Sequence, residues 1–165
     1  MTAEEFDAFY AGTVGRLVGQ LYAMTGDLTE AQDVVQEAFI RAWQRRQSLS
    51  MIGSPEAWVR TVAWRLAVSR WRRTRRSVTR WREESHDISV NAPSTDHVAL
   101  VDALRRIPEA QRIAIVLHHL CDRSIEQIAE ETGSPVGTVK ARLFRGRAAL
   151  APFLHETEPT EVSGA

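Results

Sequence analysis

Apolar side chains recur every three or four residues through almost all of the 165-residue chain. This spacing places them along one face of an α-helix, and such a face must be buried against other helices. No segment alternates apolar and polar residues with the two-residue period of a strand, and no internal repeat occurs. The sequence therefore predicts an all-α protein.

The first half of the chain predicts three helices with recognisable ends. Gly26 ends the first apolar stripe, and Thr29 is expected to cap the second helix. A polar stretch at residues 47–53 then interrupts the pattern. Ser54 followed by Pro55 provides an N-cap and a proline at the first helical position. The predicted helices cover about residues 6–25, 30–46 and 55–73.

Periodicity lapses around Pro93, and we interpret this polar segment as a linker between two small domains. Beyond it, the sequence predicts helices at about 96–107 and 109–120. Ser124 and Gln127 form a capping box for a short helix that Gly133 ends, and the last helix follows. The predicted divisions are a first domain at 1–82, a flexible linker at 83–95, a second domain at 96–155 and a disordered acidic tail at 156–165.

The formal net charge is zero, but the basic residues are concentrated in two islands. Residues 55–82 contain nine basic residues and one acidic residue, and residues 137–155 contain four basic residues and no acidic one. A single charged run is usually a solvated helix face. Two basic islands on helical patterns instead favour a surface that touches a polyanion twice, and nucleic acid is the leading partner class.

Residues 125–144 have the spacing of a helix-turn-helix. Ala129 is a small residue where the two helices touch, Gly133 suits a turn with positive φ, and Val139 is positioned to re-enter the core. The second helix could lie in a DNA major groove, with arginine or lysine reading guanine edges. An ordinary helical hairpin with a solvated basic face is the alternative. The residues predicted to face DNA are Thr138, Lys140, Ala141, Arg142 and Arg145.

Several classes of protein are disfavoured. Cys121 is the only cysteine, which excludes a disulfide scaffold and favours a reducing compartment. No apolar run approaches the roughly 18–20 residues of a membrane span, and the first residues do not resemble a signal peptide, so a cytoplasmic location is expected. His118, His119 and Cys121 could suggest a metal, but adjacent helical residues project about 100° apart, which favours a structural role. No catalytic or cofactor-binding motif occurs.

Motifs in each half of the chain resemble two conserved regions that occur in the same order in a known family. Residues 33–39 (DVVQEAF) and the basic helix at 58–73 resemble the second conserved region of bacterial RNA polymerase sigma factors. Residues 107–112 (IPEAQR) and 134–147 resemble the fourth region. The chain is similar to a group IV, or extracytoplasmic-function (ECF), sigma factor. This resemblance implies a non-enzymatic protein that binds core polymerase, directs it to promoters and assists melting of the −10 region. A stand-alone helix-turn-helix regulator and a helical metal-dependent enzyme are the alternatives.

The resemblance also implies a polymerase-binding surface. In sigma factors the matching helix docks on the coiled coil of the β′ clamp, and Asp33, Gln36 and Glu37 occupy the corresponding positions. Their spacing of three and four residues puts them on one face, opposite Val34 and Val35. Without the resemblance, these residues would be interpreted as a solvated acidic face. The implied partners are core RNA polymerase (β′ clamp and β flap) and promoter DNA, and an anti-sigma factor is a further candidate.

The third helix and the loop before it would contact unstacked −10 bases of the non-template strand. Sigma factors usually have Asn where Arg65 stands and Asp where Ser69 stands, so their base preference cannot be transferred to this chain. Trp64 and Trp71 are predicted either to form a stacking or partner surface or to pack on a neighbouring helix. The implied −10 contacts are Arg65, Ser69, Arg72 and Arg73. For the −35 element, Arg142 is expected to read bases while Lys140 and Arg145 meet phosphates.

Overall fold

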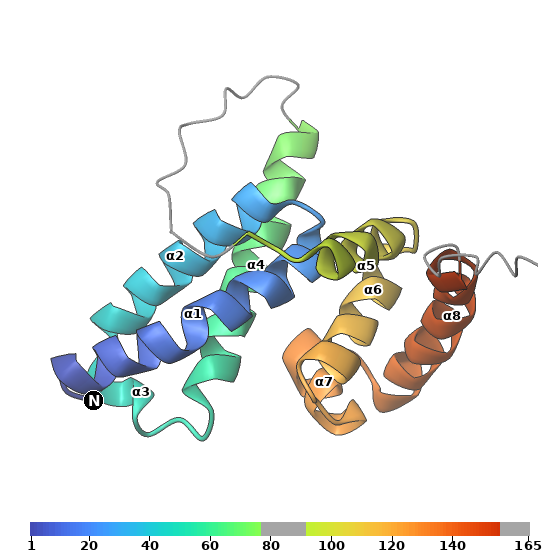
Figure 1. Ribbon diagram of the computed structural model, residues 1–165. Coiled ribbons are helices and arrows are strands. Elements are labelled where there is room, and N and C mark those ends of the chain that lie inside the picture. The colour runs from blue at the N-terminus through green and yellow to red at the C-terminus, as the bar shows by residue number, and fades with distance from the viewer. Residues whose placement is uncertain (77–91, 156–165) are drawn as a thin grey trace, which may run out of the picture. The chain divides into compact units, whose positions relative to one another are not determined.

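The computed structural model describes residues 1–76 and 92–155 of the chain. The chain divides into two compact units, residues 1–92 and 93–165 (Figure 1). Every secondary-structure element in the described residues is helical, which confirms the predicted all-α class. Most of the predicted linker and the whole predicted acidic tail lie outside the described residues.

Within residues 1–76, the first unit contains three long helices and one short helical turn. Their bounds are α1 (Ala3–Thr25), α2 (Leu28–Gln44), α3 (Arg46–Leu49) and α4 (Pro55–Arg76). Helices α1 and α2 run side by side, and α4 packs against both of them (Figure 1). Their apolar stripes meet in a core that excludes solvent, and fully burying a large aliphatic side chain contributes about 1.5–3 kcal/mol. The completely buried side chains include Leu17, Leu21, Ala31, Val34, Val35, Ala38, Leu49, Val59 and Ala63.

The ends of these helices differ from the prediction at two places. Gly26 ends α1 with a φ of 74°, and Asp27, not Thr29, is the N-cap of α2, because its side chain accepts a hydrogen bond from the Glu30 backbone N–H. Within the predicted polar stretch at 47–53, α3 forms one turn. Leu49 is completely buried and anchors this turn on the core. A single apolar residue therefore orders part of a segment whose composition suggests a loop.

An ion pair fixes the start of α4 against α1. The Arg16 guanidinium donates two hydrogen bonds to the Glu56 carboxylate, each 2.8 Å long. This hydrogen bonding lowers the pKa of Glu56, and burial partly opposes the shift. Because Arg16 is exposed, the pair orients α4 more than it stabilises the fold.

The described part of the second unit, up to residue 155, contains α5 (Thr95–Arg105), α6 (Glu109–Ile115), the π-helix η1 (Val116–Leu120), α7 (Ile125–Thr132) and α8 (Val136–His155). Helix α5 begins one residue before the prediction and is capped by Ser94. The predicted helix at 109–120 is interrupted, because the Cys121 backbone N–H donates to the Val116 carbonyl five residues earlier. The core of this unit includes Val101, Leu104, Ile113, Val116, Ile128, Val139 and Leu143.

Gly146 of α8 packs closely against α6. A Cβ atom at this position would lie 3.0 Å from Ile115 Cγ1 and 3.3 Å from Gln111 Cβ. We therefore expect Gly146→Val to destabilise the second unit by about 1–3 kcal/mol through overpacking. Gly137→Ala, in the same helix but with nothing within 4 Å of its Cβ, should not be destabilising.

Spectroscopy can assign the Gly146→Val effect to one unit. All five tryptophans lie in the first unit, so tryptophan fluorescence reports on that unit while circular dichroism reports on both. In urea titrations of the full chain, the variant should lose helical signal at lower urea while its fluorescence midpoint stays unchanged. Equal midpoints for Gly146→Val and the unsubstituted chain in both signals would contradict the close approach of α6 and α8.

Candidate nucleic-acid interface

The polar face of α2 lies opposite its buried stripe. Asp33, Gln36 and Glu37 are each partly exposed. Glu37 Oε1 accepts a 3.0 Å hydrogen bond from Arg41 Nε on the next turn. Ile40 lies at the centre of this face with 47% of its surface exposed, although it was not among the predicted polymerase-binding residues. Its spacing of seven residues from Asp33 and four from Gln36 was the available signal. The face therefore combines carboxylates with one apolar side chain.

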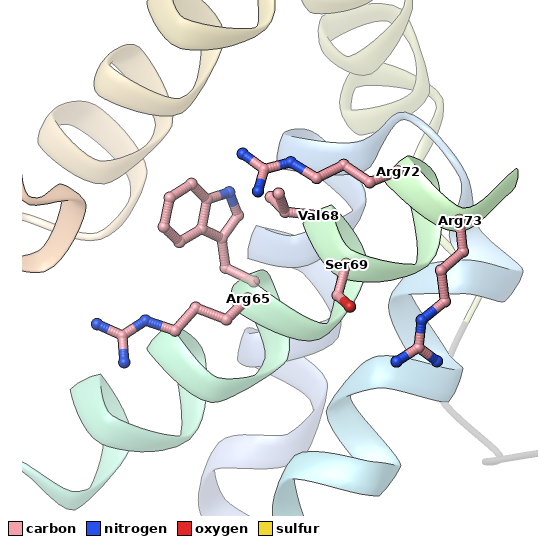
Figure 2. Close-up of a pocket in the computed structure, with 6 residues that line it drawn as sticks. Arg65, Val68, Ser69, Arg72 and Arg73 are labelled. Atoms are coloured by element: carbon pink, nitrogen blue, oxygen red, sulfur yellow. The ribbon is translucent and has the colours of Figure 1, made fainter. Parts of the chain in front are cut away.

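The predicted −10 residues lie together on one side of α4. Two rows run along this side, each with a four-residue spacing, and together they line a hollow of about 480 Å³. We call this site the α4 hollow, and its lining residues are Trp64, Arg65, Val68, Ser69, Arg72 and Arg73. Figure 2 shows Arg65 and Arg72 extending from the helix in the same direction, whereas Arg73 extends in another. The structure thus brings all four predicted −10 residues to one site.

Two other arginines of α4 lie against the rest of the unit, Arg60 buried and Arg70 partly exposed beside α2. Arg60 is 4% exposed, and Arg70 Nη1 lies 3.8 Å from Glu30 Oε1 of α2. Burial raises the pKa of Glu30, and Arg70 partly offsets this shift. Arg65, Arg72 and Arg73 are exposed. The basic island is therefore divided between cations that hold α4 on its neighbours and cations that face solvent.

The segment between α3 and α4 exposes apolar side chains. Met51 is 88% exposed and Ile52 is 37% exposed, whereas Leu49 is buried. The sequence assigned this segment to the −10 site but selected no residue within it. The signal that could have identified them was the adjacent pair of apolar residues in this short, mainly polar segment. They give the approach to α4 an apolar surface.

The second unit contains the predicted helix-turn-helix. Ser124 and Gln127 form the capping box of α7, with hydrogen bonds of 3.0 and 3.1 Å. Gly133 has a φ of 65°, which glycine adopts at little cost, and the turn leads directly into α8. Val139 is completely buried and Ala129 is partly buried. Gly133 and Val139 therefore have the structural roles predicted for them.

The side of α8 that faces away from the core is basic but not wholly polar. Lys140 and Arg145 are exposed, while Thr138 and Ala141 are partly exposed. Phe144 lies among them with 75% of its surface exposed, and it was not among the residues predicted to face DNA. Its position one residue after buried Leu143 would rotate it away from the core, and this was the available signal. The face thus offers cations, a hydroxyl group and an aromatic ring.

The Arg142 side chain is less exposed than the other two predicted DNA-binding cations of α8, Lys140 and Arg145. The sequence predicts that it projects opposite Val139 and Leu143, but the side chain is partly buried and Nη1 donates a 2.8 Å hydrogen bond to Ser134 Oγ. The reason is geometric, since a residue three positions after Val139 lies on the flank of the buried stripe. Arg145, two positions after Leu143, lies on the outer side. The guanidinium of Arg142 is therefore held at the turn that precedes α8.

The two adjacent histidines contact different partners. His118 Nδ1 lies 3.0 Å from the Arg123 carbonyl oxygen, and His119 Nε2 lies 3.3 Å from Arg147 Nε of α8. Burial lowers the pKa of His119, and the nearby His118 and Arg147 lower it further. Cys121 is partly buried. Within residues 1–76 and 92–155, no group of three or more histidine, cysteine or carboxylate side chains is arranged to hold a metal ion.

In the part of the chain that the structure describes, none of the helices has the length and apolar character needed to cross a membrane.

Both halves of the chain match families of known proteins. Residues 9–77 match the family described as Sigma-70 region 2, and residues 97–150 match the family described as Sigma-70, region 4. The "ECF RNA polymerase sigma factor SigL" of Mycobacterium tuberculosis is 33% identical over 140 residues, which cover 81% of this chain and 79% of SigL. "ECF RNA polymerase sigma factor SigW" of Bacillus subtilis is 28% identical over 151 residues, covering 82% of this chain and 81% of SigW.

A solved structure has the same fold. The sigma factor RpoE, in complex with the anti-sigma factor NepR from Bartonella quintana, superposes with a TM-score of 0.75 at 25% identity. The match covers 95% of this chain and 100% of RpoE. The helical units, the helix-turn-helix and the two sigma regions agree with these relatives. The chain therefore belongs to the ECF sigma factors of bacterial RNA polymerase.

Proposed function

We propose that this sigma factor uses three of its surfaces to place core RNA polymerase on a promoter. The polar face of α2 binds the β′ clamp, α4 and the segment before it bind the −10 element, and α8 binds the −35 element. The observation that carries the proposal is that a region 2 match at 9–77 and a region 4 match at 97–150 occur in one chain. That combination disfavours a stand-alone helix-turn-helix regulator, which needs no region 2.

The α2 face suits a basic helical partner. Asp33 and Glu37 supply negative charge four residues apart, and Gln36 can donate and accept hydrogen bonds between them. Ile40 adds apolar area at the centre, where it would be desolvated on binding. Charge complementarity speeds association and fixes the register of the partner helices. The second unit completes the contact with polymerase through the β flap.

The −10 contacts use the exposed cations of α4. Arg65, Arg72 and Arg73 can neutralise phosphates of the separated non-template strand. Met51 and Ile52 supply apolar side chains of the kind that insert between base steps and unstack them. Together these residues bind the melted strand more tightly than the duplex, and this difference drives melting.

The −35 contacts divide among the exposed residues of α8. Arg145 is the residue best placed to read a guanine, and Phe144 can contact a thymine methyl group. Lys140 provides a phosphate contact. Arg142, hydrogen-bonded to Ser134, positions the turn before α8. This division differs from the sequence expectation because it follows the observed placement of Arg142.

The remaining roles follow from the family. Sigma factors are in general non-enzymatic, and we propose that this chain acts in the cytoplasm through polymerase without catalysing a reaction itself. RpoE was solved in complex with an anti-sigma factor, and we propose that an inhibitory protein of this class also regulates this chain.

Run-off transcription with core polymerase on genomic DNA, followed by mapping of start sites, tests the proposed function. Reproducible starts that share −10 and −35 sequences are expected, and starts equal to those of core polymerase alone would contradict it.

We expect substitutions of Lys140, Arg142 and Arg145 in α8 to have different effects when −35 variants compete for holoenzyme. Holoenzyme carrying Arg145→Ala should lose about 1–3 kcal/mol of discrimination between −35 variants, because a bidentate contact to guanine is lost. Lys140→Ala should weaken binding to all promoters alike and lower the salt dependence by about one unit of slope. Arg142→Ala should reduce affinity without changing the order of preference. A flattened preference in Arg142→Ala, with full preference in Arg145→Ala, would return the base-reading role to Arg142.

A further inference from the structure

The charge of α2 and of the segment that follows it reverses sign along the chain. Residues 28–39 contain three acidic residues and no basic one, whereas residues 40–54 contain three basic residues and no acidic one. The three basic residues are Arg41, Arg45 and Arg46. A basic helical partner that suits Asp33 and Glu37 is repelled by cations at the other end of α2. The basic end of α2 therefore suits a different, anionic partner.

Helix capping explains only part of this basic end. Cations near a helix C-terminus interact favourably with the helix dipole. Arg46 has such a role, because its Nη1 donates a 3.3 Å hydrogen bond to the Trp43 carbonyl oxygen in the last turn of α2. Arg41 pairs with Glu37, one turn earlier in the helix. Arg45 is exposed to solvent.

Trp43 holds the Arg46 guanidinium in place. The guanidinium carbon lies 4.2 Å from the centre of the Trp43 ring, which makes a cation–π contact. The Trp43 ring packs against Phe6 of α1, with ring centroids 5.2 Å apart. A guanidinium has five N–H donors in a rigid fork, and the hydrogen bond to the Trp43 carbonyl uses one of them. Arg46 is therefore preorganised to bind a phosphate group.

The basic end of α2 is continuous with the surface proposed to bind the −10 element. Arg46 begins the single turn of α3, which leads into the segment before α4 (Figure 1). Within that segment, the backbone N–H groups of Met51 and Ile52 donate to the carbonyls of Ser48 and Leu49. These hydrogen bonds tie the exposed apolar pair to α3. A strand that passes from α4 over Met51 and Ile52 therefore reaches Arg46 next.

We propose that Arg45 and Arg46 bind phosphates of the non-template strand immediately downstream of the −10 element. The direction follows from the order of the chain, since α4 continues from its C-terminal end to the second unit, which in the proposed function binds the upstream −35 element. The Arg46 end of the strand-binding surface is then the downstream end. The inference rests on the proposed function and adds a fourth contact surface to it. Because phosphate contacts carry no sequence information, this surface binds any downstream sequence.

Titration of holoenzyme with non-template strands of different length tests this assignment. One strand ends at the last base of the −10 element, a second extends a few nucleotides further downstream, and a third extends equally far upstream. Two phosphate contacts on a single strand steepen the dependence of log affinity on log salt by about 1.4 units. Between 50 and 200 mM salt, the affinity advantage of the downstream extension should therefore shrink about sevenfold more in the unsubstituted holoenzyme than in Arg45→Ala combined with Arg46→Ala. Contacts from core polymerase are the same in both holoenzymes and cancel in this comparison.

A matched control is Arg105→Ala combined with Arg106→Ala, which removes an exposed arginine pair from the end of α5. Arg106, like Arg46, lies over an aromatic ring. This control should retain the full salt effect of the downstream extension. If loss of Arg46 perturbs α3, Arg45→Glu leaves Arg46 in place and should still reduce the downstream advantage.

Two results would overturn the proposal. One is an equal salt effect of the downstream extension in the unsubstituted holoenzyme and in folded variants of Arg45 and Arg46. The other is an effect of these variants that is confined to the upstream extension. Failure of the unsubstituted holoenzyme to bind even the short −10 strand would instead refute the proposed function.

Discussion

Asp33→Ala combined with Glu37→Ala is expected to lower the affinity for core RNA polymerase by at least about thirtyfold. Removing one partner of a buried, hydrogen-bonded charge pair at an interface costs about 2–5 kcal/mol, and this variant removes two carboxylates from the same face. The fold should be nearly unaffected, because both side chains lie opposite the buried stripe of α2. The 3.0 Å pair between Glu37 and Arg41 is exposed and contributes little to stability.

The measurement is a titration of labelled sigma factor with core polymerase, supported by circular dichroism of the free variant. Glu4→Ala with Asp7→Ala is a matched control, because it removes two exposed carboxylates from α1 of the same unit. The control should bind polymerase normally. If both double variants bind equally well, the polar face of α2 is not the polymerase-binding surface.

Arg72→Ala combined with Arg73→Ala is expected to impair promoter melting more than promoter binding. Each phosphate contact contributes a factor of about three to the loss of affinity between 50 and 200 mM salt, so two contacts contribute about tenfold. The deficit of the variant on a duplex promoter should therefore be largest at 50 mM salt, and it should shrink by about tenfold, relative to the unsubstituted holoenzyme, at 200 mM salt. A template already mismatched across the −10 region should lose much less, because the energy of strand separation is supplied in advance.

The paired templates provide the control for this variant, since both present the same −35 element to the same holoenzyme. Single-round transcription at two salt concentrations gives the comparison. An equal loss on both templates would mean that the two arginines hold duplex DNA or support the fold. Arg70 is left unchanged in this design because its pairing with Glu30 contributes to packing between α2 and α4.

Helix positions could be predicted where the sequence contains both an apolar period and a local end signal. Gly26, the Ser124 capping box and Gly133 act through their own backbone and side-chain chemistry, so their effects can be interpreted without tertiary structure. The π-helix at 116–120 could not be predicted in this way. Its defining hydrogen bond, from Cys121 to Val116, depends on how the following segment packs. The short α3 likewise could not be predicted, because it depends on the burial of Leu49 in the folded unit.

The candidate site was likewise predictable in part, and the features that depend on packing were missed. The family resemblance, together with helical spacing, pointed to Arg65, Ser69, Arg72 and Arg73 as one surface, and the structure brings them together. Exposed apolar residues escaped the sequence analysis because an apolar residue in a helical pattern is ordinarily assigned to the core. Burial is a property of the assembled fold, so the exposure of Ile40, Met51 and Phe144 becomes evident only after packing. Arg142 was misplaced for a related reason, because its hydrogen bond to Ser134 depends on the geometry of the turn.

The direct packing of α2 on α4 has a mechanical consequence. Val34, Val35 and Ala38 of α2 are completely buried, as are Val59 and Ala63 of α4, and such close-packed interiors deform little. In the proposed function, a pull on DNA bound at α4 would therefore be transmitted to polymerase bound at α2 with little deformation of the first unit. The unit would act as a short, stiff link between the proposed polymerase contact and the proposed strand contact. A smaller side chain in place of Val35 would loosen the packing between α2 and α4 and make this link more deformable.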